Sequence, residues 1–152
     1  MRQILSVLDL PPVWLIAHVA AVSALAQASP TVFGAFGDAL GPALLALGVG
    51  VMLVAVWQMA QHRTTVIPRR NPSSLVTTGV FAWSRNPIYL GNTIAMTGAA
   101  LAFANPWFLP AALIAALAVT RLAIQREEAH LAARFGAAWD TYSQRTARWF
   151  GR

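Results

Sequence analysis

Long apolar stretches divide this chain, and they constrain its fold more than any other feature. Residues 39–60 contain no charged side chain, and a helix of that length can cross the ~30 Å hydrocarbon core of a bilayer. Comparable stretches run over residues 12–28, 87–104 and 107–124. The sequence therefore predicts an all-α integral membrane bundle with about four transmembrane helices.

Composition agrees with a membrane protein. Of the 152 residues, 57% are hydrophobic and only 11% are charged, whereas a soluble domain carries about 25% charged residues. We expect residues 1–152 to form a single membrane domain, without a separate soluble catalytic domain. The absence of cysteine excludes disulfides, thiolate catalysis and Cys-ligated metals, and three scattered histidines do not indicate a metal site. No bound metal is predicted.

The first apolar stretch has two interpretations. Arg2 and an apolar run, followed by Ala24-Leu25-Ala26 or Ala26-Gln27-Ala28, are together similar to a signal peptide with its cleavage site. Asp9 and Pro11-Pro12 fit such a peptide poorly, and prolines are well tolerated at the start of a helix. We therefore interpret residues 12–28 as the first transmembrane helix.

The distribution of arginine predicts the orientation in the membrane. The loop 61–86 carries four arginines and the tail 125–152 carries five, while the loops after the first and third stretches carry none. The positive-inside rule then places both termini, the long loop and the tail in the cytoplasm, as in a multi-pass inner-membrane protein. These arginines flank apolar stretches, so we expect contact with anionic lipid headgroups and no binding of nucleic acid.

Small residues predict close helix contacts. Gly37 and Gly41 lie near the start of one stretch, and Gly91, Ala95, Gly98 and Ala102 form a stripe along another. Asn105-Pro106 is typical of a turn, so the stretches 87–104 and 107–124 should form a hairpin. The tail should continue as an amphipathic helix over residues 127–143, with Leu131, Phe135, Trp139 and Tyr142 on one face. Such a helix can lie at the membrane surface.

Two polar clusters, residues 84–87 and 126–128, are brought to the same end of this hairpin. Charge at the end of a membrane helix is costly unless it is paired or binds something, so a functional site is expected there. Asn86 can cap a helix that begins at Pro87, which would explain both residues without a ligand. The same helix N-terminus can instead attract an anion. Tyr89 can be an interface aromatic or can stack on a ligand.

The second cluster also has two interpretations. Arg121, Gln125 and Glu128 share a helix face at the spacing i, i+4, i+7. Arg121 can simply extend its guanidinium toward the interface, or it can pair with Glu128 or hold a ligand carboxylate. Glu127 and Glu128 can form an exposed pair with neighbouring arginines, or they can belong to the site.

The motifs around these clusters resemble a known family. Leu-Val-Thr-Thr-Gly-Val-Phe-x-x-Ser-Arg-Asn-Pro-x-Tyr-Leu-Gly is followed by Glu-Glu-x-x-Leu-x-x-x-Phe-Gly-x-x-Trp-x-x-Tyr and a terminal Arg-Trp. This pattern, over about residues 64–150, resembles the isoprenylcysteine carboxyl methyltransferases and is similar to the related phospholipid N-methyltransferases. Asn86 stands where many relatives have histidine, and Trp139 stands where tyrosine is common.

The resemblance implies a membrane-embedded methyltransferase that uses S-adenosyl-L-methionine. It implies cofactor binding by the residues that match the two motifs, to which Gly79 and Gln125 are added: Gly79, Arg85, Asn86, Pro87, Tyr89, Gly91, Gln125, Glu127 and Glu128. Arg121, Glu127 and Glu128 are the predicted catalytic residues, with a glutamate as base if the acceptor is an amine.

The expected reaction is methyl transfer to a lipophilic acceptor dissolved in the bilayer, similar to that of isoprenylcysteine carboxyl methyltransferases. The first alternative is a phospholipid amine N-methyltransferase. Further alternatives are an NADPH-binding membrane reductase, because the C-terminal region of membrane sterol reductases is similar, and a non-enzymatic scaffold or lipid-binding protein. Neither the acceptor nor the oligomeric state follows from the sequence.

Overall fold

The described part of the chain is helical. A computed structural model describes residues 33–65, 72–103 and 108–150, together with Ala20 and Ala24. Within these ranges the backbone forms helices and turns without a β-strand, in agreement with the predicted all-α class. The elements are α3 (Gly34–Gln61), the 3₁₀ helix η1 (Gly79–Ala82), α4 (Pro87–Ala102), α5 (Phe108–Val119), the π-helical turn η2 (Thr120–Ile124), α6 (Gln125–Phe135) and α7 (Ala137–Arg145).

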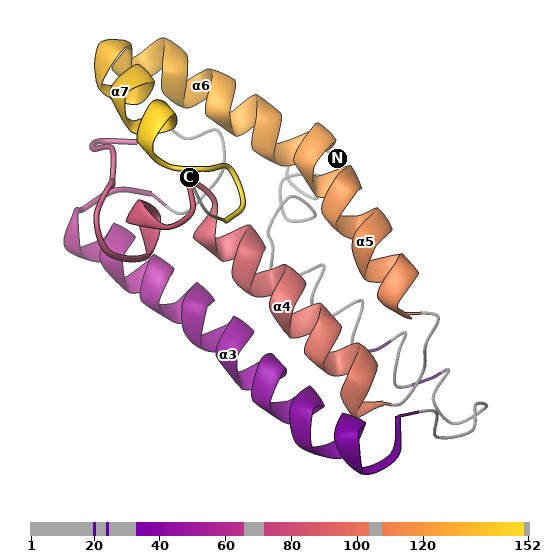
Figure 1. The fold of residues 1–152 in the computed structure, drawn as a ribbon. Helices are drawn as coiled ribbons and strands as arrows, with labels where there is room; N and C mark the ends of the chain where they lie inside the picture. Colours follow the sequence, from indigo (N-terminus) through magenta and orange to yellow (C-terminus); the bar gives the residue numbers. More distant parts are fainter. Residues whose placement is uncertain (1–19, 21–23, 25–32, 66–71, 104–107, 151–152) are drawn as a thin grey trace.

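Three long helical segments set the shape (Figure 1). Helices α3 and α4 lie side by side in opposite directions, and the orange rod of α5, η2 and α6 returns antiparallel to α4. The end of α3, the start of α4 and the helices α6 and α7 therefore meet at the same end of the molecule. Because α4 and α5 contact each other and run in opposite directions, the predicted hairpin is present.

Glycines bring α3 and α4 into backbone contact. A Cβ built on Gly48 would lie 2.4 Å from the backbone N of Ala95, and one on Gly98 would lie 2.4 Å from the N of Leu45. Gly41 meets Ala102 in the same way. No side chain fits at these distances, so the helices can approach this closely only where both carry small residues. The predicted tight contact along the small-residue stripe is thereby explained.

One described helix supports the prediction of transmembrane helices. Among the described residues, α3 is long and apolar enough to cross a membrane, with a mean hydropathy of 2.3 in its most apolar window. Helix α4 has 16 residues and α5 has 12, although α5 continues through η2 into α6. The first predicted span, 12–28, lies almost entirely outside the described residues, so the four-span arrangement stays a prediction.

The tail differs from the single amphipathic helix expected over residues 127–143. Gly136 has φ +50°, a left-handed conformation that suits glycine, and it separates α6 from α7. The chain turns there, and α7 folds back over the end of the bundle (Figure 1). Trp139 and Tyr142 are consequently buried instead of lying on an exposed surface.

Two glycines in α3 allow a matched test of the helix contact. Gly48→Ala forces a methyl group into the α4 backbone, so we expect a loss of about 1–3 kcal/mol in the free energy of unfolding. Gly50 has no atom within 4 Å of a built Cβ, so Gly50→Ala should be neutral or stabilise by about 0.5–1 kcal/mol. Thermal unfolding of both variants in detergent measures the difference, and equal unfolding temperatures would contradict the proposed packing.

Candidate functional site

A cavity of about 120 Å³ lies where the helix ends meet. A single buried water needs only about 10–15 Å³ on such a measure, so the cavity has room for a larger ligand. Its wall is formed by the end of α3 and the loop after it, η1, the start of α4, and α6 and α7. The lining residues are Met59, Thr64, Thr65, Pro72, Ser74, Leu75, Val76, Phe81, Arg85, Asn86, Pro87, Ile88, Tyr89, Glu127, Leu131, Trp139 and Tyr142.

The start of α4 uses Asn86 for more than a helix cap. Asn86 occupies the N-cap position before Pro87, as the sequence predicts, but its side chain makes no capping hydrogen bond. Its Nδ2 instead donates to Glu128 Oε1 at 3.1 Å. The backbone N–H of Asn86 donates to the hydroxyl of Ser84, which is fully buried. Capping alone therefore does not explain this asparagine, because its amide joins the two polar clusters.

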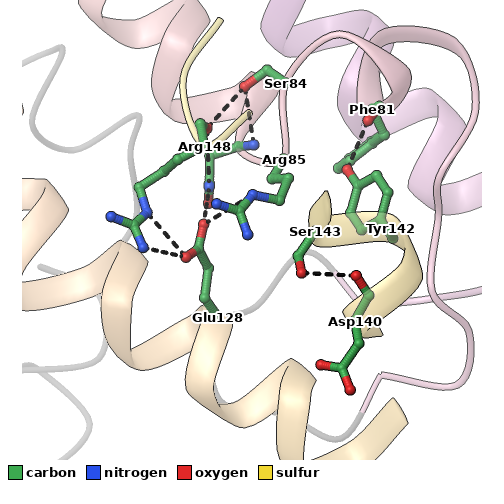
Figure 2. A network of polar contacts seen from close by, with 9 residues as sticks. Phe81, Ser84, Arg85, Glu128, Asp140, Tyr142, Ser143 and Arg148 are labelled. Carbon is green, nitrogen blue, oxygen red and sulfur yellow. Dashed lines mark hydrogen bonds and ion pairs between the residues drawn. The ribbon is translucent and has the colours of Figure 1, made fainter. Parts of the chain in front are cut away.

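Glu128 is a buried carboxylate surrounded by donors (Figure 2). It is only 7% exposed, and its Oε2 accepts from Arg148 Nε at 3.0 Å and Arg148 Nη2 at 2.7 Å. Its Oε1 accepts from Asn86 and lies 3.6 Å from Arg85 Nε. This pairing satisfies a charge that would otherwise be expensive to bury. The bond to Glu128 in turn raises the pKa of the Arg148 guanidinium.

Arg85 lies between the carboxylate and an aromatic wall. Its guanidinium is 5.6 Å from the centre of the Trp139 ring, within the range of a cation–π contact. Its Nε is buried and has no hydrogen-bond partner, because 3.6 Å from Glu128 is an ion-pair distance and is too long for a good hydrogen bond. The hydroxyl of Thr64, on the facing loop, is also buried without a partner. The cavity thus has polar groups whose bonding capacity is not met by the protein.

Two further contacts hold the walls of the cavity in place. The Tyr142 hydroxyl donates to the backbone O of Phe81 at 2.7 Å, and the Tyr142 ring meets Trp139 edge-on. Arg134 Nε on α6 donates to the backbone O of Pro72 at 2.6 Å. Burial raises the pKa of the Tyr142 phenol above its ordinary range, so this donor stays protonated in the folded state.

Only part of the predicted site lies on the cavity. Arg85, Asn86, Pro87, Tyr89 and Glu127 line it, and Glu128 lies behind them in the polar network. These residues come from the two predicted polar clusters. The fold places the two clusters next to each other, as the predicted hairpin of residues 87–104 and 107–124 implied.

The other predicted residues have different surroundings. Gly79 has φ +61°, and a Cβ there would collide with the Gln58 amide, while Gly91 packs against the backbone of α3. Arg121 and Gln125 are exposed although Glu128 is buried, so the three do not share an environment. The π-helical turn Thr120–Ile124 has a wider repeat than an α-helix, which shifts the register that the α-helical spacing assumed.

Several residues of the site did not stand out in the sequence. Arg148 is near the end of the chain, and only the terminal Arg-Trp of the motif pointed to it. Trp139 and Tyr142 were expected on an amphipathic surface, yet both line the cavity. Ser84 is a small residue whose role depends on its backbone partners. Among the described residues, no group of three His, Cys, Asp or Glu side chains is arranged to hold a metal ion.

The Tyr142 hydrogen bond predicts a pH-dependent effect. Tyr142→Phe leaves the Phe81 carbonyl without its partner, which should cost about 1–3 kcal/mol near neutral pH. Because the folded-state pKa is raised, wild-type stability from this group is present below pH ~10 and falls as pH rises above it, by about 1.4 kcal/mol at pH ~11. The gap in unfolding temperature between the two proteins should therefore narrow at high pH.

The composition of the chain limits the number of other side chains that titrate between neutral pH and pH ~11. The chain has no lysine and no cysteine, and its other tyrosine, Tyr89, is present in both proteins, so it cancels in the difference. A gap that stays constant from neutral pH to pH ~11 would contradict a buried, protonated Tyr142 donor.

Comparison with known proteins agrees with the geometry. The chain is 32% identical over 114 residues to the nickel-cobalt-cadmium resistance protein NccN of Alcaligenes xylosoxydans xylosoxydans, an alignment that covers 74% of this chain and 52% of that protein. The chain thus spans about half the length of this curated relative. The family model described as phospholipid methyltransferase matches residues 36–138, which is more than half of the chain and includes most of α3, all of α4 and both glutamates. The chain belongs to the phospholipid methyltransferase family.

Proposed function

We propose that this protein transfers a methyl group from S-adenosyl-L-methionine to a lipophilic acceptor in the membrane. The observation that carries the proposal is the cavity at the helix ends, where Arg85, Asn86, Tyr89 and Glu127 converge from the two motifs. Membership of a methyltransferase family supports the reaction class.

The residues of the cavity fit the chemistry of this cofactor, which has a carboxylate, an ammonium, a sulfonium and an adenine. Arg85, with an unsatisfied buried Nε, would hold the carboxylate. Glu127 would hold the ammonium. Tyr89 and Trp139 offer aromatic faces to the adenine or to the positive sulfonium. The hydroxyl of Thr64 adds a further polar group without a partner in the protein.

When bound, the cofactor supplies an activated methyl group for an in-line displacement. The protein's contribution is then alignment, which can supply roughly 7–11 kcal/mol, and the exclusion of water. The apolar part of the cavity wall, including Leu75, Val76 and Phe81, would exclude water. A carboxylate or thiolate acceptor needs no base, whereas an amine acceptor must lose a proton, which a carboxylate of the site would accept.

The acceptor is proposed to be lipophilic because the cavity lies at the ends of helices that carry exposed apolar side chains. Among described residues, large apolar side chains of α3 and of the α5–η2 rod are exposed, as expected for surfaces that face lipid: Leu47, Leu53, Trp57, Leu113, Ile114, Leu117 and Leu122. An acceptor could enter sideways from the bilayer. The two acceptor classes to compare are an isoprenylcysteine carboxylate and a phospholipid amine. The site is proposed to lie on the cytoplasmic side of the inner membrane.

Ligand-dependent stability tests the cofactor. A ligand that binds only the folded state at a hundredfold excess over its Kd should add about 2.7 kcal/mol to the free energy of unfolding. We expect S-adenosyl-L-methionine and S-adenosylhomocysteine to raise the unfolding temperature of the detergent-solubilised protein. A rise with NADPH alone would favour the reductase, and no rise with any of the three would favour a scaffold.

A pair of carboxylate variants tests the site. Glu127→Gln removes the charge proposed to hold the ammonium, so S-adenosylhomocysteine should bind at least tenfold more weakly, equivalent to about 1.4 kcal/mol. Asp140→Asn removes an exposed carboxylate of α7 outside the cavity lining and should bind like the wild type. Isothermal titration calorimetry measures the affinity of both variants for S-adenosylhomocysteine, and equal affinities would contradict a role of Glu127 in binding.

A further inference from the structure

The two adjacent glutamates lie in different environments. Glu127 lines the cavity, whereas Glu128 is turned away from the lining and is buried in the polar network of Figure 2. Both oxygens of Glu128 are already engaged, one by Asn86 and Arg85 and the other by both donors of Arg148. A ligand ammonium that bound to Oε2 would have to displace two charge-assisted hydrogen bonds from Arg148.

The C-terminal segment is held to the start of α4 by its backbone as well. The Ser84 hydroxyl donates to the backbone O of Arg148 at 3.2 Å, and Asn86 Nδ2 lies 3.3 Å from the same oxygen. One residue earlier, the O of Ala147 accepts from the backbone N–H of Arg85 at 3.0 Å. The residues 84–86 are thereby fastened on one side to the tail and on the other to α6.

This arrangement fixes two groups of the cavity. Asn86 is hydrogen-bonded to Glu128 and to the tail backbone, whereas Arg85 is hydrogen-bonded to the tail backbone and lies at ion-pair distance from Glu128. Both residues line the cavity. Arg148 itself does not line it. Removal of the Arg148 charge would leave Glu128 buried beside Arg85 at 3.6 Å, so Arg85 would be drawn toward the carboxylate and away from the position it has in the cavity wall.

We propose that Arg148 is a positioning residue that acts through Glu128, and that Glu127 alone of the two glutamates is a ligand-contacting group. The ion pair of Arg148 with Glu128 holds the segment 84–86 so that Arg85 and Asn86 are set for a ligand. The effect on ligand binding rests on the proposed function, whereas the effect on the segment 84–86 does not.

Two measurements on the full chain separate these effects. Hydrogen exchange of the ligand-free protein reports the order of residues 84–86, and calorimetry reports the affinity for S-adenosylhomocysteine. We expect Arg148→Gln to accelerate exchange in this segment and to weaken binding at least tenfold, with Arg148→Lys intermediate because it keeps the charge without the paired Nε and Nη2 donors. Arg145→Gln, at an exposed position three residues earlier, should match the wild type in both.

The double variant Glu128→Gln with Arg148→Gln distinguishes positioning from direct contact. In the double variant no unpaired carboxylate remains to draw Arg85 away from the cavity wall, so the double variant should bind more tightly than Arg148→Gln alone. Unchanged exchange in residues 84–86 of Arg148→Gln would overturn the proposal. So would a Glu128→Gln variant that loses binding with normal exchange, since that result would make Glu128 a direct ligand. If the wild type binds no S-adenosylhomocysteine, the proposed function fails, and exchange alone still decides the role of Arg148.

Discussion

The buried carboxylate of Glu128 is the interaction on which the site depends. A charge at this depth is tolerated only with opposite charge and hydrogen bonds around it, and the partners of this α6 residue come from two other parts of the chain: Arg85 and Asn86 before α4, and Arg148 in the tail. The hydrogen bonds and ion pairs of this one carboxylate therefore connect the start of α4, the rod of α5–η2–α6 and the tail. The cavity lies against this junction, so its geometry is a consequence of how the charge is paired.

The glycine contact between α3 and α4 complements that electrostatic junction. Because Gly41, Gly48 and Gly98 have no side chains, the backbones of α3 and α4 come into contact and the two helices form a tightly packed pair. Asn86 and Pro87 lie at the N-terminal end of α4 in this pair, where the polar network begins. The cavity is consequently built on the ends of rigid helices, an arrangement that suits a reaction in which alignment supplies much of the rate enhancement.

The neighbouring glutamates illustrate how one helix can divide structural and chemical tasks. Successive residues on a helix point in directions about 100° apart. Glu127 thus faces the cavity while Glu128 faces Asn86 and Arg148, although a sequence motif presents them as a pair. The break at Gly136 then folds Trp139 and Tyr142 over the same cavity, where they meet Arg85 and Phe81.

The sequence by itself determined the helical class, the small-residue contact, the hairpin and the meeting of the two polar clusters, because apolar length, glycine spacing and turn residues act locally. The family was also evident from the spacing of its motifs. Only the tertiary structure decided which members of the clusters reach the cavity. The π-helical turn changed the register of Arg121 relative to Glu128, and Gly136 redirected the aromatic face. The pairing of Glu128 with Arg148 joins residues twenty positions apart through a reversal of the chain, and burial, which local patterns do not report, makes that pair necessary.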